Sequence, residues 1–254
     1  GCFASFYNWR DGIGPRKDRK PVNSEYWGGL EENFTGTAEF LEMCKMVGSE
    51  PFICVNMITG SPSEAAAWIR YCNSTDGDQM DKLRKEHGYG DPFRVKYWEL
   101  DNETYRRWGY EEYARRCIEF SKSMKAADPS IQLVLVGYGS FNVNLREMLD
   151  IAGKHIDLVC DRATTEIALK KDLEIISEYN RKHGTNIRLC NTEWWAHISE
   201  GKGSLARKIM ANPLDPERIA THQVKVSWNY AMNIAYKLLM FQRLGGDFEF
   251  SNFN

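Results

Sequence analysis

The chain has 254 residues, of which 43% are apolar and 13% aromatic, and this composition predicts a folded domain with a substantial core rather than a disordered chain. Its 33 basic and 35 acidic residues leave a formal net charge of −2, so neither nucleic acid nor an anionic membrane surface is expected as a partner. No apolar run reaches the ~20 residues that a membrane-spanning helix needs.

Short apolar runs alternate along the chain with longer stretches of helical periodicity. Their length and their β-branched and aromatic content predict seven strands. In chain order these strands cover Cys2 to Tyr7, Pro51 to Met57, Val95 to Asn102, Ile131 to Tyr138, Ile156 to Asp161, Ile187 to Glu193 and Phe248 to Phe253. Near-continuous apolar runs of this kind are typical of a parallel sheet that helices cover.

Three helices have specific start or stop signals. Ser61-Pro62-Ser63-Glu64 combines an N-cap serine, a first-turn proline and a glutamate, which predicts a helix from there to about Tyr71. The segment from Tyr110 to Ala126 carries one apolar stripe and is stopped by Asp128-Pro129. A last helix is expected within Glu217 to Leu244. Its expected buried face comprises Val224, Trp228, Ala231, Ala235 and Leu238.

The alternation of strands and helices predicts an α/β fold, specifically a TIM-type (β/α)8 barrel formed by residues 1–254 as a single catalytic domain. With seven strands recognised, the barrel is expected to be incomplete and to lack its first strand. An open doubly wound sheet is the structural alternative. Gly12-Ile13-Gly14 lacks the third glycine and the following helix of a dinucleotide fingerprint, so no such cofactor is expected.

Two of the predicted strands end in carboxylates. Glu103 closes the segment Trp98-Glu-Leu-Asp-Asn-Glu103, and Glu193 lies 90 residues later in Asn191-Thr-Glu-Trp-Trp195. In parallel barrels the catalytic groups come from the C-terminal ends of several strands, and glycosidic bonds are usually broken by a pair of Asp or Glu residues. The sequence therefore predicts that Glu103 and Glu193 form a catalytic pair.

Five blocks carry a resemblance to a known family. They are Phe3-Ala-Ser-Phe-Tyr-Asn-Trp-Arg-Asp-Gly-Ile-Gly-Pro15, Glu50-Pro-Phe-Ile-Cys-Val-Asn56, Ser61-Pro-Ser-Glu-Ala-Ala-Ala-Trp68 with Tyr71-Cys-Asn73, Tyr97-Trp-Glu-Leu-Asp-Asn-Glu103, and Thr192-Glu-Trp194. With these blocks the chain resembles the catalytic barrel of glycoside hydrolase family 51, a family of α-L-arabinofuranosidases with some endoglucanases and xylanases in the retaining clan A. The family's C-terminal β-sandwich is expected to be absent here.

The resemblance implies a role for each strand-end residue. Glu103 would be the general acid/base, Glu193 the nucleophile, and Asn102 would hold the sugar 2-hydroxyl. A retaining enzyme needs its two carboxyl groups about 5 to 5.5 Å apart, because one attacks the anomeric carbon while the other protonates the leaving oxygen. Glu99 and Asp101 alternate with Leu100 and Asn102 along the strand, so we expect them to face away from the site and to make structural ion pairs.

The other candidate substrate-binding residues are aromatic or amide side chains near strand ends. They are Trp194, Trp195, Tyr7, Asn8 and Asn56. One of the two tryptophans is expected to offer a flat face to a sugar ring, although tryptophan beside a core strand more often packs in the core. Tyr7, Asn8 and Asn56 would line the same opening.

No cofactor or metal is expected. The five histidines show no ligand spacing and no Cys-His cluster. The seven cysteines are an odd number without a CxxC pair, which predicts buried free thiols. Unpaired cysteines favour the cytoplasm over secretion, and both compartments stay open. The expected partner is a polysaccharide or oligosaccharide, and the chain is compatible with an oligomer.

Three functions remain. The first is retaining endo-cleavage of β-1,4-glucan or xylan, as in a cellulase or xylanase. It is favoured because Asp161 and Arg162 stand where the family usually has a histidine and a tyrosine. The second is an α-L-arabinofuranosidase that releases arabinose side groups. The third is a carbohydrate-binding barrel without turnover, which the presence of both glutamates argues against.

Overall fold

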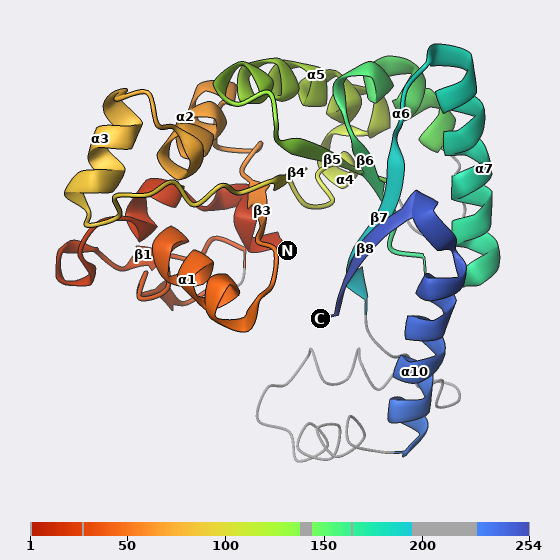
Figure 1. The fold of residues 1–254 in the computed structure, drawn as a ribbon, viewed down its shortest axis with the longest axis horizontal. Helices are drawn as coiled ribbons and strands as arrows, with labels where there is room; N and C mark the ends of the chain where they lie inside the picture. The colour runs from red at the N-terminus through yellow and green to blue at the C-terminus, as the bar shows by residue number, and fades with distance from the viewer. Residues whose placement is uncertain (1, 27, 138–143, 164, 195–227, 254) are drawn as a thin grey trace.

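The computed structural model describes residues 2–26, 28–137, 144–163, 165–194 and 228–253. Its centre is a sheet of six parallel strands whose spatial order equals their order in the chain. The strands are β3 (Phe52–Val55), β4 (Tyr97–Leu100), β5 (Gln132–Val136), β6 (Leu158–Cys160), β7 (Arg188–Trp194) and β8 (Phe248–Phe253). Figure 1 shows the sheet curving between helices, as part of a barrel wall would.

Six of the seven predicted strands are confirmed, and the first is wrong. Cys2–Phe6 forms a 3-10 helix, η1, instead of a strand. Its backbone closes locally, since the amide of Tyr7 donates to the carbonyl of Ala4 at 3.2 Å. The structure also contains a short antiparallel hairpin that was not predicted, formed by β1 (Val22–Asn23) and β2 (Leu30–Glu31).

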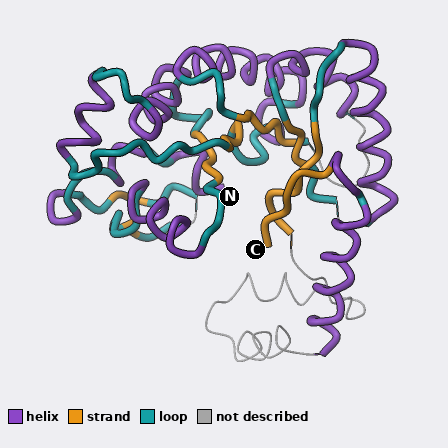
Figure 2. Tube along the Cα trace, in the orientation of Figure 1, coloured by secondary structure: helices purple, strands orange, loops and turns teal. Residues whose placement is uncertain are grey.

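The helices lie around the strands, as the tube in Figure 2 shows. The two with the strongest signals are confirmed as α2 (Pro62–Asn73), which Ser61 caps by accepting from the amide of Glu64, and α5 (Tyr110–Ala127). The other α-helices are α1 (Thr37–Val47), α3 (Gln79–Glu86), α4 (Tyr105–Trp108), α6 (Leu145–Ala152), α7 (Glu166–His183) and α10 (Trp228–Arg243). Further 3-10 turns are η2 (Trp9–Gly12), η3 (Arg16–Asp18), η4 (Gly153–His155) and η5 (Gly245–Asp247).

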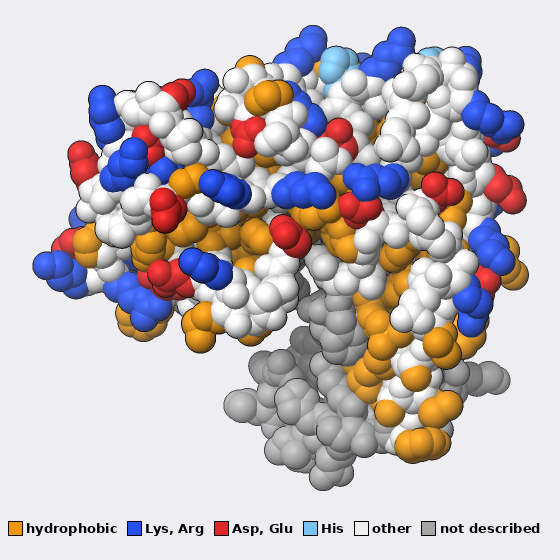
Figure 3. Space-filling view, in the orientation of Figure 1, with side chains coloured by type: hydrophobic (Ala, Val, Ile, Leu, Met, Phe, Trp, Pro, Cys, Tyr) orange, Lys and Arg blue, Asp and Glu red, His pale blue; other side chains and the backbone are white. Residues whose placement is uncertain are grey.

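The predicted buried face of the last helix is wrong. Within α10, Trp228 is 77% and Leu238 47% exposed, and Val224 lies outside the described residues. The buried side chains follow another stripe of the same period: Tyr230, Lys237, Met240, Phe241 and, just past the helix end, Leu244. Both stripes have helical spacing, so periodicity alone could not choose between them. Figure 3 shows the hydrophobic side chains that this helix leaves on the surface.

Each face of the sheet has its own apolar cluster. The outer face packs against the helices through residues such as Trp98, Leu133 and Leu189. On the inner face lie Tyr97, Val134, Leu158, Cys160 and Cys190, with Phe52 and Phe250 packed against them. Because side chains alternate along a strand, the inner cluster identifies which strand residues point into the concave side where a barrel site is built.

The prediction of free thiols is confirmed for the six cysteines whose side chains are described. Cys44, Cys72, Cys117, Cys160 and Cys190 are buried, and Cys54 is half-buried. Within the described ranges, no helix combines the length and the apolar character that crossing a bilayer requires.

Candidate active site

Glu103 and Glu193, 90 positions apart in the sequence, meet at one arginine. The Nη1 atom of Arg162 lies 3.0 Å from Oε1 of Glu103 and 2.9 Å from Oε2 of Glu193. Because both oxygens contact the same nitrogen, they are no more than about 6 Å apart, which is compatible with the spacing of a retaining pair. The two side chains are 21% and 25% exposed, so solvent reaches both.

A strained turn at the end of β4 presents Glu103. Asp101 and Glu103 both have positive φ, at 61° and 54°, a conformation that is costly for residues other than glycine and that collects at functional sites. Asp101 anchors the turn: its carboxylate accepts from the backbone amide of Met57 at 2.5 Å, from the amide of Asn102 at 2.6 Å, and from the hydroxyl of Ser5. Burial raises the pKa of Asp101.

Asp101 was expected to make ion pairs, and it instead accepts hydrogen bonds from uncharged donors. Asp101 is fully buried, and its partners come from η1 and from the end of β3. The 3-10 helix that the sequence analysis took for a strand thus has a specific task, because it carries Ser5 to the turn that holds Asn102 and Glu103.

Glu193 stands on the last part of β7, where the strand is irregular. The register between β7 and β8 shifts between Asn191 and Trp194, and such bulges redirect side chains beside active sites. Asn191 fixes the backbone there: its Oδ1 accepts from the amide of Glu193 at 3.2 Å, and its Nδ2 donates to the carbonyl of Ala163 at 3.3 Å.

The expectation that Glu99 faces away from the site is wrong. Oε1 of Glu99 accepts from the hydroxyl of Thr192 at 2.7 Å, and Thr192 also contacts the Cys160 thiol of the inner cluster at 3.0 Å. Glu99 is 1% exposed and thus buried on the inner side of the sheet, next to the strand segment that carries Glu193. Its partner is a hydroxyl and not the cation that was expected.

Arg162 follows β6 and is 13% exposed. Its Nη2 donates to Oδ1 of Asn102, so one guanidinium contacts three residues of the predicted site, both glutamates and this asparagine. Burial alone would lower the pKa of Arg162, but the neighbouring Cys160, Glu99, Glu193 and Glu103 raise it above its ordinary value. The arginine is therefore a permanent cation.

The predicted residues Tyr7, Asn8 and Asn56 line a common pocket of about 310 Å³ at the end of β3. Arg10 and Glu64 also line it and form an ion pair at 2.8 Å, and Trp68 is a further lining residue. The pocket adjoins the Asp101 turn through β3, whose Val55 pairs in register with Leu100 of β4. The residues that line it do not include Glu103 or Glu193.

The side chains of Asn56 and Asn8 both make hydrogen bonds to the chain itself. Oδ1 of Asn56 accepts from the amides of Ile58, Thr59 and Gly60, and its Nδ2 donates to the carbonyl of Tyr7 and to the Thr59 hydroxyl. Asn8 caps η2 by accepting from the amide of Arg10. Asn56 therefore organises the loop after β3, and a role for it in binding sugar stays a prediction.

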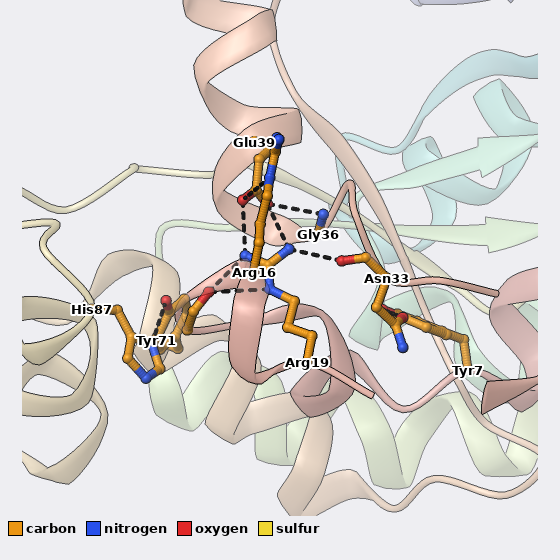
Figure 4. Close-up of polar contacts among 9 residues, drawn as sticks. Tyr7, Arg16, Arg19, Asn33, Gly36, Glu39, Tyr71 and His87 are labelled. Atoms are coloured by element: carbon orange, nitrogen blue, oxygen red, sulfur yellow. Dashed lines mark hydrogen bonds and ion pairs between the residues drawn. The ribbon is translucent and has the colours of Figure 1, made fainter. Parts of the chain in front are cut away.

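The loop that carries Tyr7 is fixed by the network drawn in Figure 4. The hydroxyl of Tyr7 donates to Oδ1 of Asn33 at 2.7 Å, and the guanidinium of Arg19 donates to the carbonyl of Asn33 and to Glu39. A Cβ on Gly36 would lie 1.6 Å from the carbonyl oxygen of Gly12, so this close crossing requires glycine. The hydroxyl of Tyr7 thus points into the protein scaffold.

Of the two tryptophans, Trp194 lies in the core. It is 3% exposed and packs edge-on against Phe241 of α10, with ring centroids 5.2 Å apart. This is the packing role that the sequence analysis gave as the more common one. Trp195 lies outside the described residues. In the portion of the chain that the structure describes, no cluster of three His, Cys, Asp or Glu side chains is arranged to hold a metal ion.

Sequence reasoning did not place Glu99 in this site, and it noted Arg162 only as a departure from the family's usual histidine and tyrosine, without a role beside the glutamates. Arg162 directly follows the predicted strand that ends at Asp161, so its position at a strand end was a usable signal. For Glu99 the signal was alternation with period two, which places it on the same face as Tyr97. The structure shows that this shared face is the inner one.

Residues 1–158 match the family described as the alpha-L-arabinofuranosidase 1 domain. The chain is 44% identical over 143 residues to alpha-L-arabinofuranosidase C of Emericella nidulans, an alignment that covers 54% of this chain and 28% of that protein. It is 31% identical over 245 residues to an intracellular exo-alpha-(1->5)-L-arabinofuranosidase of Halalkalibacterium halodurans, covering 84% and 49% of the two chains. The chain therefore spans half or less of the length of these two relatives.

Solved structures agree with the sequence matches. The whole chain aligns with 53% of the GH51 alpha-L-arabinofuranosidase from Thermotoga petrophila, at a TM-score of 0.79 and 29% identity. A Thermotoga maritima alpha-L-arabinofuranosidase, solved as an arabinose complex, aligns with 80% of this chain and 46% of its own, at a TM-score of 0.69 and 33% identity. These similarities confirm the predicted fold class, a TIM-type barrel of which the described residues form part.

Proposed function

This chain belongs to glycoside hydrolase family 51, and from that premise we propose that it carries the catalytic centre of an α-L-arabinofuranosidase. The names of its relatives support this activity over endo-cleavage of β-1,4-glucan or xylan, the function that the sequence analysis favoured. The activity and substrate of the whole protein are part of the proposal, because the chain spans 28% and 49% of the two relatives compared.

The observation that carries the proposal is the convergence of Glu103 and Glu193 on one nitrogen atom. In the proposed mechanism Glu193 attacks the anomeric carbon and displaces the leaving oxygen, which takes a proton from Glu103. A covalent glycosyl-enzyme results. Glu103 then removes a proton from water, and the water releases the sugar with its original anomeric configuration.

Asn102 and the pocket at the end of β3 would bind the substrate. Asn102 lies between the turn residues that orient Glu103, and its amide contacts the same arginine as both glutamates. In retaining enzymes, hydrogen bonds to the sugar 2-hydroxyl strengthen in the transition state, and Asn102 would make such a contact in the proposed mechanism. The pocket would hold the part of the substrate beyond the cleaved bond.

The test is hydrolysis of an aryl α-L-arabinofuranoside, compared with xylan, carboxymethyl cellulose and β-glucan. We expect release from the arabinofuranoside, and a loss of at least about 100-fold in both Glu103→Ala and Glu193→Ala. Glu178→Ala, which removes a half-exposed carboxylate on α7, is the control. Activity that survives both site substitutions contradicts the mechanism. Cleavage of β-glucan or xylan alone would restore the endo-acting hypothesis, and sugar binding without turnover would favour a binding domain.

A further inference from the structure

We propose that Arg162 is a positioning residue of this site, which sets the spacing of Glu103 and Glu193 and the orientation of Asn102. The inference rests on the proposed function and adds a residue that neither accepts nor donates the catalytic proton. It applies to a side chain that sequence reasoning did not include among the site residues.

The contacts of Arg162 join three segments of the fold. Nη1 contacts Glu103, after β4, and Glu193, on β7, while Nη2 contacts Asn102. The guanidinium is planar, and its donors have fixed relative positions. A group of this shape that bonds three partners at once therefore constrains their mutual geometry, which separate bonds to separate residues would not do.

The charges around Arg162 give a second reason to expect that it positions the two glutamates. Glu103 and Glu193 lie within about 6 Å of each other, and Glu99 is buried close enough to raise the pKa of Arg162. Whenever these carboxyl groups are ionised together they repel one another, and a cation in contact with two of them opposes that repulsion. Removing the guanidinium should therefore let the pair move apart.

Arg106 provides a natural contrast. It forms an ion pair with Oε2 of Glu103 at 3.2 Å, three residues along the chain, but its side chain is 61% exposed. Exposed ion pairs of this kind contribute little free energy to holding a side chain in place. Arg106 is expected to screen one carboxylate, whereas Arg162 links two.

The ion pairs of Arg162 with Glu103 and Glu193 cannot both persist when substrate binds. In a retaining mechanism the anomeric carbon and the leaving oxygen must come within reach of both carboxylates, so the sugar displaces at least one of the two Nη1 contacts. The Nη2 contact with Asn102 can persist. Arg162 would then act on the geometry of the carboxylates more than on sugar affinity, which predicts an effect on kcat rather than on KM.

The kinetic test compares Arg162→Ala, Arg162→Lys and Arg106→Ala with the unchanged chain on an aryl α-L-arabinofuranoside. Loss of alignment predicts a fall of about 100-fold in kcat for Arg162→Ala, with KM changed less than about threefold. Arg162→Lys should recover part of the loss because it restores the charge without the fork. Arg106→Ala should lose much less. An Arg162→Ala variant with undiminished kcat and a lower KM overturns the proposal, since Arg162 would then only compete with the sugar.

A second test measures structure and requires no turnover of substrate. It can therefore fail or succeed independently of the proposed function. Crystal structures of the unchanged chain and of Arg162→Ala, or of Arg162→Gln where the alanine variant does not fold, give the separation of the two carboxylates. We expect the nearest oxygens to move beyond about 6 Å, and an unchanged separation overturns the positioning role. If the separation grows while the unchanged chain hydrolyses nothing, the proposed function fails and the positioning role stands.

Discussion

Asp101 shows how one residue can prepare the site without belonging to it. Its buried carboxylate accepts hydrogen bonds from two backbone amides and one hydroxyl. Asp101 has a φ of 61° and is the first residue of the turn that ends at Glu103. A carboxylate can accept several hydrogen bonds at once. The side chain of Asp101 therefore serves as acceptor for the backbone amides of Met57 and Asn102. The strain at Glu103 is sustained by this anchor.

Replacing that anchor should cost stability and activity together. Asp101→Ala leaves the amides of Met57 and Asn102 without their acceptor, and we expect the free energy of unfolding to fall by about 2 to 4 kcal/mol. Activity should fall as well, because the turn no longer fixes Glu103. Ser5→Ala, which removes one donor only, is the milder control. Chemical denaturation measures the difference, and equal stabilities for Asp101→Ala and the unchanged chain would show that the turn does not depend on this carboxylate.

Among the helices and strands, the strand ends could be predicted from the sequence, and the segments between them less well. Buried strands are marked by apolar runs, so the amino-acid pattern alone places the carboxylates of Glu103 and Glu193 at one edge of the sheet. The segment Cys2–Phe6 has the same apolar character but closes on itself, because its backbone bonds locally. The strand-end position of Arg162 was visible in the sequence, but its contact with both glutamates was not, because only the fold brings the three side chains together.

The loop network around Arg19 gives a pH-dependent prediction. Burial alone would raise the pKa of Glu39, but hydrogen bonds from Arg19 and the Gly36 amide lower it from 4.5 to about 2. Because the folded-state pKa lies below the unfolded one, this contact stabilises the fold above about pH 4.5, and the stabilisation is lost as the pH falls toward 2.

Unfolding free energies of the unchanged chain and Glu39→Gln, measured between pH 7 and pH 2, test this prediction. The gap between the two proteins should be largest near neutral pH and should close as acid is added. A gap that stays constant over the whole range would mean that the charge of Glu39 does not contribute to the fold.

The fold as a whole buries its thiols because each face of the sheet has an apolar cluster. Cys72 and Cys117 lie in the outer core, and Cys160 and Cys190 in the inner cluster. Burial raises the pKa of the Cys72, Cys117 and Cys190 thiols, which suppresses the reactive thiolate.

Thiol titration of the native and the denatured protein checks this packing. The buried cysteines should react with a disulfide reagent at least about 100-fold more slowly in the native state than in denaturant, because reaction requires local or global opening. Rapid native-state labelling of Cys160 or Cys190, located by peptide mapping, would contradict the described inner face.

In the proposed mechanism Glu193 is the nucleophile of a retaining centre and Glu103 its acid/base. A mechanism-based fluorinated arabinofuranoside, which forms the glycosyl-enzyme but releases it slowly, tests this most directly. Peptide mass spectrometry should find the sugar attached to Glu193, and the label should be absent in Glu193→Ala. A label on another carboxylate, or turnover of ordinary substrate with no covalent sugar at any residue, would contradict the assignment of Glu193 as nucleophile.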